Sequence, residues 1–219
     1  MNVLAVGAHW DDIELGCGLT LHRLKQQKHT IYGAVLTSSE YKVEEDNHSR
    51  TGYDAHLEGT KSFEEQGIIH LPTTPLPNQQ MSYSQKIMQE LENYVNKYSI
   101  DLVFVHWHGD LNTDHAINWI IAKTAFRKVK NVLQYQSNAY FDNINIFTPQ
   151  FFFGFSEKEY EFKKKILSIH SIEWEYRKER WEREIFDREK AWGYLCGYDY
   201  GEAFMVSKLL DNSLRGVMK

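Results

Sequence analysis

Short apolar runs alternate along this chain with longer segments whose apolar residues recur at helical spacing. The runs are continuous rather than alternating, which is typical of strands buried on both faces of a parallel sheet. They predict strands at residues 3–8, 30–36, 68–70 and 101–105, with weaker signals at 132–136 and 150–153. The intervening and following segments predict helices at residues 13–24, 54–66, 83–98 and 115–128, and one or two more over 156–192.

Strands that alternate with helices predict the fold class: an α/β, Rossmann-like protein with a mostly parallel sheet and helices on both faces. Residues 38–53 are polar and lack apolar periodicity, so we expect a mobile loop there. Three of the four prolines fall in residues 71–78, which indicates a loop rather than a linker because α/β units flank it. Since there is no internal repeat, we expect a single domain over residues 1–219.

Composition narrows the class of protein. The chain has 219 residues, 25 basic and 30 acidic, and a formal net charge of −5, which argues against a broadly basic nucleic-acid binder. No apolar run approaches the roughly 18–20 residues of a membrane span, and residues 1–14 lack the basic start of a signal peptide. Cys17 and Cys196 are too few for a disulfide scaffold, so we expect a reducing, cytoplasmic location. A homo-oligomer remains open.

Two polar clusters follow predicted strands. His9, Asp11 and Asp12 come directly after the first strand. The strand at residues 101–105 is followed by a second group: His106, His108, Asp110, Asn112, Asp114 and His115. Ligands of such sheets bind at the carboxyl ends of the strands, in the turns that enter the helices. Both clusters are therefore candidates for one functional site.

The residue types suit a metal site. Imidazole and carboxylate groups are usual ligands of a catalytic zinc, which keeps an open position for water. The spacing His9-x-x-Asp12 allows one turn to place both side chains on one ion, and His115 can supply a third ligand. Asp11 would then be free to act as a general base on water. The alternative is that Asp11-Asp12, like the acidic residue before His115, only caps a helix start, and spacing alone leaves both readings open.

The chain resembles the PIG-L/LmbE-type deacetylases, zinc-dependent hydrolases that remove acyl groups from N-acylated sugars. AHWDDIELGCG at residues 8–18 is similar to the AHPDDxExGCG signature of that family. Residues 110–115, DLNTDH, resemble its second signature, D-x-N-x-D-H. Weaker similarities at residues 37–40, 170–171 and 201–204 extend the resemblance along most of the chain.

The resemblance implies roles for particular residues. His9, Asp12 and His115 correspond to the zinc ligands, and Asp11 to the base that activates water. Asp114 precedes a ligand, and we expect it to orient His115 or a neighbouring imidazole. Iron(II) suits the same set of two histidines and one carboxylate, so zinc and Fe²⁺ are both candidate cofactors.

The sequence departs from the family at three places. Trp10 replaces a common proline, which alters the wall of the site. Many members have an oxyanion-stabilising histidine where this chain has Asn112, a residue that can donate a hydrogen bond without charge. His106, His108 and His170 are alternatives for that role. Arg50 lies slightly before the place of the family's arginine at the second helix, and we expect it, with His108 and His170, to contact substrate.

We therefore expect a zinc-dependent hydrolase that removes an acetyl or formyl group from a small-molecule amino sugar or sugar conjugate, with nucleotide-linked sugars among the candidates. Two alternatives stay open: a non-catalytic carbohydrate-binding protein that retains the metal site, which Asn112 would favour, and an amidase acting on a non-sugar N-acyl compound. The residues that select the substrate are expected in the loops at 38–53, 71–82 and 137–149. Trp174, Trp181 and Trp192 are candidates for a sugar-stacking wall as well as for core packing.

Overall fold

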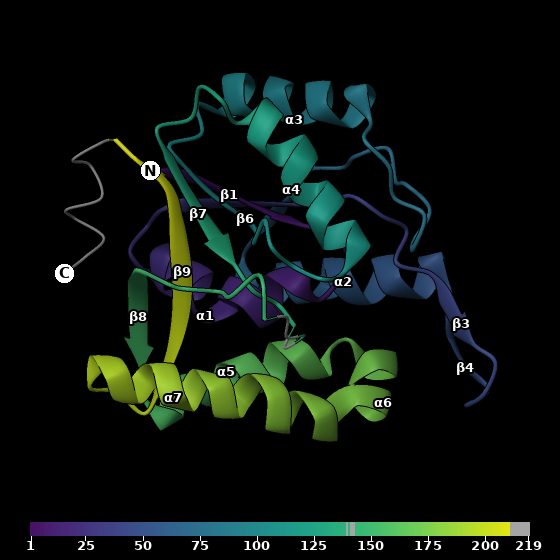
Figure 1. Cartoon of the computed structure of the whole chain (residues 1–219), viewed down its shortest axis with the longest axis vertical. Coiled ribbons are helices and arrows are strands. Elements are labelled where there is room, and N and C mark those ends of the chain that lie inside the picture. Colours follow the sequence, from purple (N-terminus) through teal and green to yellow (C-terminus); the bar gives the residue numbers. More distant parts are fainter. Residues whose placement is uncertain (139, 141–142, 211–219) are drawn as a thin grey trace.

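A seven-stranded sheet with strand order β5-β2-β1-β6-β7-β9-β8 forms the centre of the computed structural model, which describes residues 1–138, 140 and 143–210 (Figure 1). The parallel part comprises β1 (Asn2–Gly7), β2 (Thr30–Val35), β5 (Ile69–His70), β6 (Leu102–His106) and β7 (Asn131–Tyr135). At one edge, β9 (Tyr200–Leu209) runs antiparallel to both β7 and β8 (Phe151–Phe155). The expected mostly parallel sheet is confirmed.

Helices cover both faces of the sheet (Figure 1). One face carries α3 (Gln85–Tyr98) and α4 (Thr113–Ala125), which share an apolar core with β1, β2 and β6. The other face carries α1 (Asp12–Gln26), α2 (Gly52–Gln66), α5 (Glu157–Ser168), α6 (Ser171–Trp181), a π-helical turn η1 (Glu182–Phe186) and α7 (Asp187–Cys196). α6, η1 and α7 follow one another without a loop. The expected helices over 156–192 therefore form two continuous runs, α5 and the run from α6 to α7.

Two segments differ from the sequence-based expectations. The polar stretch 38–53 contains an antiparallel hairpin of β3 (Tyr41–Val43) and β4 (His48–Arg50) rather than only a loop. The strand β9 was not predicted at all. Its third residue, Glu202, is fully buried, and a charged residue inside the strand interrupts the apolar pattern that marks the other buried strands.

Glu202 accepts hydrogen bonds from backbone groups that a break in helix α1 leaves free. The backbone of Cys17 leaves the helical region (φ −152°, ψ 15°), so the next turn begins with free N–H groups. Those of Leu19 and Thr20 donate to the Glu202 carboxylate at 3.0 and 2.8 Å. Lys163 of α5 lies 2.9 Å from the same carboxylate. These contacts fix the helix whose first residue is Asp12.

Among the described residues, none of the helices combines the length and the apolar character that crossing a membrane requires.

Candidate metal centre

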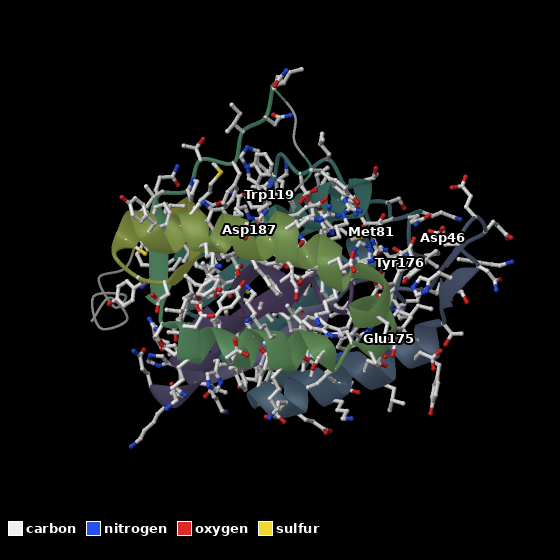
Figure 2. The ribbon with its side chains drawn as sticks, turned by 90° about the horizontal axis from the view of Figure 1, so that it is seen from below. Asp46, Met81, Trp119, Glu175, Tyr176 and Asp187 are labelled. Carbon is white, nitrogen blue, oxygen red and sulfur yellow. The ribbon has the colours of Figure 1, made fainter. Side chains whose placement is uncertain are left out.

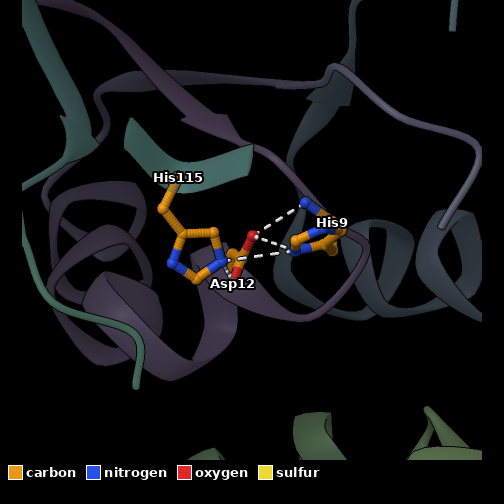
Figure 3. Close-up of side chains that lie close together, drawn as sticks. All are labelled: His9, Asp12 and His115. Carbon is orange, nitrogen blue, oxygen red and sulfur yellow. Dashed lines mark hydrogen bonds and ion pairs between the residues drawn. The ribbon is translucent and has the colours of Figure 1, made fainter. Parts of the chain in front are cut away.

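Two turns at the carboxyl edge of the sheet bring the predicted ligands together (Figure 3). His9 lies in the turn after β1, Asp12 is the first residue of α1, and His115 lies in the first turn of α4. Since β1 and β6 are neighbouring parallel strands, the turns that follow them meet. Asp12 lies 3.2 Å from His9 Nδ1 through Oδ2 and 3.2 Å from His115 Nε2 through Oδ1. The two ring nitrogens are 3.3 Å apart.

Each imidazole is held through its other nitrogen by a carboxylate. His9 Nε2 lies 3.2 Å from Asp114 Oδ2, and His115 Nδ1 lies 3.0 Å from Asp110 Oδ2. Metal-binding histidines are typically oriented in this way, since the partner fixes the ring and its tautomer. The donor set of two imidazole nitrogens and a carboxylate, all within 4.8 Å of one another, therefore fits a zinc or iron(II) ion.

Of the two expected partners of Asp114, His115 or a neighbouring imidazole, the structure has the second. Asp114 contacts His9, the neighbouring imidazole, and its carboxylate also accepts the backbone N–H groups of Gln79 at 2.7 Å and Met81 at 3.2 Å. Sequence reasoning gave no role to Asp110, which orients His115. Its position two residues before the cap of α4 is the signal that could have identified it.

Asn112 is the N-cap of α4. Its side-chain oxygen accepts the backbone N–H groups of Asp114 and His115 at 2.9 and 3.4 Å. Asn112 thus helps to position the helix that carries His115. Its expected role in catalysis stays a prediction.

The loop after β7 supports the same carboxylates. Ser137 Oγ donates to Asp12 Oδ1 at 2.9 Å, and Asn138 Nδ2 donates to both oxygens of Asp110 at 2.8 and 2.9 Å. Arg188 of α7 holds this loop by donating to the Gln136 carbonyl at 3.0 Å. The positions of these two carboxylates thus depend on a loop that Arg188, from the C-terminal helices, holds in place.

Electrostatics at the site favour positive charge next to Asp12. Burial lowers the pKa of His9, but Asp12 and Asp114 outweigh it and raise the value to about 9. For His115, burial is likewise outweighed by Asp12 and Asp110, and the pKa rises to about 10. Asp12 itself has a pKa well below its usual range, because the surrounding imidazoles overcome the effect of burial. Such carboxylate-rich surroundings stabilise a cation at this position.

His106 forms a second group with Asp110 and His115. Its ring is fully buried and stacks on the His115 ring at a centroid distance of 3.9 Å. Burial and the charge of His115 lower the pKa of His106 to about 4, so it stays neutral beneath the ligand ring. This packing makes it a support for His115 at the floor of the site.

Asp11 lies between the ligands in sequence and faces the same cavity. Its backbone adopts φ 154° and ψ −23°, a conformation that non-glycine residues rarely adopt and that costs of order 1–3 kcal/mol. Burial, together with Asp12 and Glu173, raises the pKa of Asp11 to about 7. A carboxyl with that pKa can both accept and return a proton near neutrality.

The cavity has a volume of about 400 Å³ and all three predicted loops contribute to its lining, through Ser39, Tyr41 and Val43, through Asn78 and Gln79, and through Ser137, Asn138 and Tyr140. Sequence reasoning missed most of one wall, which α6 and η1 supply: Glu173, Arg177, Arg180, Trp181, Glu184 and Ile185. Of the three candidate tryptophans, Trp181 is in this lining. The other wall residues were hidden because their segment has the charge density of a solvated helix face.

The three expected substrate contacts have different positions. Arg50 lines the cavity, but its side chain is almost fully buried and donates to the Trp10 carbonyl at 3.1 Å and to Glu58 at 3.0 Å. His170 is fully buried behind it and accepts from Arg50 Nη2 at 3.1 Å, so it contacts Arg50 rather than the cavity, and its expected substrate contact stays a prediction. His108 lies outside the cavity lining, with Nδ1 2.9 Å from the Gln134 side chain, and its expected contact also stays a prediction.

The chain matches the sequence pattern of a known protein family. The sequence pattern of the PIG-L family, described as GlcNAc-PI de-N-acetylase, matches residues 4–126, which is more than half of the chain. The chain is a member of the PIG-L family. The resemblance seen in the two signatures is thereby confirmed, and so is the expected enzyme class, a deacetylase that hydrolyses an N-acetyl amide. The match ends before the helices that form the missed wall.

Known proteins agree with this assignment. The chain is 28% identical over 176 residues to an uncharacterized deacetylase, YaiS, of Escherichia coli K12, covering 77% of this chain and 90% of that protein. The structure superposes on an N,N'-diacetylchitobiose deacetylase from Pyrococcus horikoshii with a TM-score of 0.77 and 17% identity, over 94% of this chain and 83% of the other.

The same fold also carries another reaction. A 4-carboxy-2-hydroxymuconate hydratase from Pseudomonas putida KT2440 superposes with a TM-score of 0.73 and 14% identity, over 96% of this chain and 98% of that one. At these identities the superpositions show the fold alone. The reaction and substrate must therefore be argued from the side chains of the site.

Proposed function

We propose that this protein is a metal-dependent hydrolase that removes the N-acetyl group of an amino sugar or sugar conjugate, with zinc as the metal. One observation carries the proposal: His9 Nδ1, Asp12 and His115 Nε2 converge within 3.3 Å of one another, while Asp11 faces the same cavity. Three protein ligands and an open side are the arrangement of a catalytic rather than a structural zinc.

Different residues of the chain have different roles in the proposed reaction. A zinc ion in this donor set would polarise the amide carbonyl and make a water molecule acidic enough to attack at neutral pH. Asp11 accepts the proton of the attacking water and returns it to the amine that leaves. Asp110 and Asp114 keep the two imidazoles oriented throughout, since each holds the ring nitrogen that faces away from the ligand position.

The sugar assignment rests on the family and on the wall of the cavity. The family description and the P. horikoshii relative both concern N-acetylated amino sugars. Trp181 and Tyr41 supply aromatic surface, and amide and hydroxyl groups such as Asn78 and Ser39 supply hydrogen bonds. This combination is typical of a site that fixes a polyhydroxylated ring. A formyl group and nucleotide-linked sugars are included in the proposal.

The departure at Asn112 does not favour a non-catalytic binding protein. That position is explained by capping, because the asparagine oxygen satisfies two N–H groups at the start of α4. Binding alone also does not require the strained backbone of Asp11, which places a carboxyl of raised pKa beside the candidate metal site. An amidase acting on a non-sugar compound would use the same metal and base, so a panel of sugar and non-sugar substrates separates the two.

The metal is tested by elemental mass spectrometry on purified wild type, His9→Ala and His108→Ala. We expect about one zinc or iron per chain in wild type and in His108→Ala, whose ring lies outside the cavity, and little in His9→Ala. Equal metal in all three proteins would refute the assigned centre.

Turnover is tested by release of acetate or formate from a panel of N-acylated amino sugars, sugar nucleotides and non-sugar amides. Asp11→Asn should keep its metal and lose activity by about 10²–10⁴-fold, the usual contribution of a general base. Full activity in that variant would remove the assigned base. Release from the non-sugar amides alone would favour the amidase.

A further inference from the structure

Two arginines of α6 face the metal cavity from the wall that the family match does not include. Arg177 and Arg180 are three residues apart, which places them on one face of the helix, and both line the cavity. Their side chains are 29% and 42% exposed, so both can reach a ligand. The acidic residues Asp11, Asp12 and Asp114 come instead from the turns at the sheet edge.

Each guanidinium is held by a glutamate through Nε. Arg177 Nε donates to Glu173, one turn earlier, and Arg180 Nε donates to Glu184 at 2.8 Å, one turn later. A guanidinium bonded in this way still presents its Nη1–Nη2 edge, which is shaped for two parallel hydrogen bonds to an oxyanion. The glutamates thus restrict both side chains before any ligand arrives, which lowers the entropic cost of binding.

Aromatic rings from two separate loops add to this restriction. Arg177 lies over the Tyr41 ring at 5.7 Å, and Arg180 lies over the Tyr140 ring at 5.4 Å. Tyr41 belongs to the β3–β4 hairpin, whose far end is tied to α6 by a 2.5 Å hydrogen bond from the Tyr176 hydroxyl to Asp46 (Figure 2). The hairpin and α6 therefore form one continuous rim.

Each arginine of this wall has a glutamate partner: Glu173 for Arg177, Glu184 for Arg180 and Glu58 for Arg50. Arg50 is almost fully buried, so the exposed cations of the wall are Arg177 and Arg180. The subsite therefore rests on the remaining N–H donors of these two guanidiniums rather than on an excess of positive charge. A hydrogen bond from a charged donor is stronger to an oxyanion than to a neutral hydroxyl.

We propose that Arg177 and Arg180 form a subsite for an anionic group of the substrate, a phosphate or a carboxylate carried by the same molecule whose N-acetyl group lies at the metal centre. This rests on the proposed function and narrows its substrate class to acidic N-acetylated amino sugars. A sugar phosphate, including the diphosphate of a nucleotide-linked sugar, and a sugar carboxylate share the oxyanion that the two guanidiniums recognise.

The test compares three substrates that differ in charge: N-acetylglucosamine 1-phosphate, N-acetylmuramic acid and the neutral methyl N-acetylglucosaminide. We expect wild type to have a lower KM for at least one of the acidic compounds than for the neutral one. Arg177→Gln and Arg180→Gln should each raise that KM by about 10- to 100-fold, the range for a lost hydrogen bond to a charged group. The KM of the neutral compound should change by less than about threefold. Whichever acidic compound responds identifies phosphate or carboxylate as the group.

Lys178→Gln is the matched control. It removes a cation from the same helix, but Lys178 lies outside the cavity lining, over the Trp174 ring and near Glu182. Equal KM values for acidic and neutral compounds in wild type, or equal effects of Lys178→Gln and the arginine variants, would overturn the subsite.

A failure of the proposed function would be recognised separately. If none of the three compounds releases acetate, calorimetric titration of zinc-loaded Asp11→Asn with the two acidic compounds still tests the subsite. Binding that weakens about 10-fold or more when Arg177→Gln is added supports it, and binding that is unchanged overturns it. Turnover of the neutral compound alone would confirm the reaction and refute the subsite.

Discussion

Replacing Lys163 by methionine tests how the C-terminal elements hold helix α1. The Lys163 ammonium is fully buried and lies 2.5 Å from Glu189 and 2.9 Å from Glu202. It also donates to the Leu15 carbonyl at 2.8 Å, a group exposed by the break in α1. Methionine fills a similar volume but leaves two buried carboxylates without their cation. Removing one partner of a buried ion pair costs about 3–5 kcal/mol.

The same helix offers a control for this change. Lys165 lies 2.5 Å from Glu65, the same separation, but its side chain is 58% exposed and that of Glu65 is 37% exposed. Such surface pairs contribute about 0–1 kcal/mol because water screens them. Since each kcal/mol shifts Tm by roughly 2–4 °C in a chain of this size, we expect losses of about 6–20 °C for Lys163→Met and about 0–4 °C for Lys165→Met.

Thermal unfolding followed by circular dichroism measures both losses, with urea unfolding as a check on the free energies. Equal Tm values for the two variants would refute the reasoning, because burial is what distinguishes two ion pairs of equal length. A small loss for Lys163→Met together with a lower urea slope would indicate instead that the native state had loosened.

The stability loss of Lys163→Met should depend on pH because Glu189 titrates. Burial raises the pKa of Glu189 above its usual value, and Lys163 partly opposes this, so removal of Lys163 raises it further. A carboxyl with a raised pKa in the folded state holds its proton there and releases it on unfolding, so stability falls as the pH rises toward the folded pKa. The Tm difference between wild type and Lys163→Met is therefore expected to be smaller at pH 5 than at pH 8. A larger difference at pH 5 would contradict the assignment.

Two further substitutions test the site and its surroundings. Asp110→Asn removes the charge 3.0 Å from His115 Nδ1 and should weaken zinc binding by about 10- to 100-fold in a chelator competition, whereas unchanged affinity would show that Asp110 does not support the ligand. Gly59→Ala places a Cβ 2.0 Å from the Trp10 ring, so urea unfolding should show a loss of about 1–3 kcal/mol; an unaffected protein would mean that the ring can move aside.

The cluster of the candidate metal centre was predictable because its residues follow strand ends directly in the sequence. His9 and Asp12 are within one turn, and His115 begins the helix after a strand that pairs with β1. Which carboxylate orients which ring was not predictable. Asp114 is adjacent to His115 in sequence but contacts His9, because successive residues of a helix point in different directions.

Strand β9 and the α6 wall of the cavity were not predicted because they contain charged residues, which resemble solvent-exposed positions. Glu202 lies near the start of the unpredicted strand β9, and its carboxylate is compensated by Lys163, 39 positions earlier. A pattern search weighs such a residue as solvent-exposed, since only the folded chain reveals the partner that allows its burial. Arg177 and Glu173 line the cavity, although the charge density of their segment is typical of a solvated helix face.

The division of the cavity between two parts of the chain explains how one fold can serve several reactions. The proposed ligands and the proposed base lie between His9 and His115, inside the region that matches the family, whereas the wall at residues 173–185 lies outside it. Two links connect this wall and its neighbouring helices to the first turn. Glu173 lies 3.8 Å from Arg50 Nη1, which donates to the Trp10 carbonyl, and Ser137 and Arg188 connect the C-terminal helices to Asp12. In the proposed arrangement a change at Arg177 or Arg180 is therefore expected to alter which molecule is held, whereas a change at Arg188 is expected to move Asp12 as well.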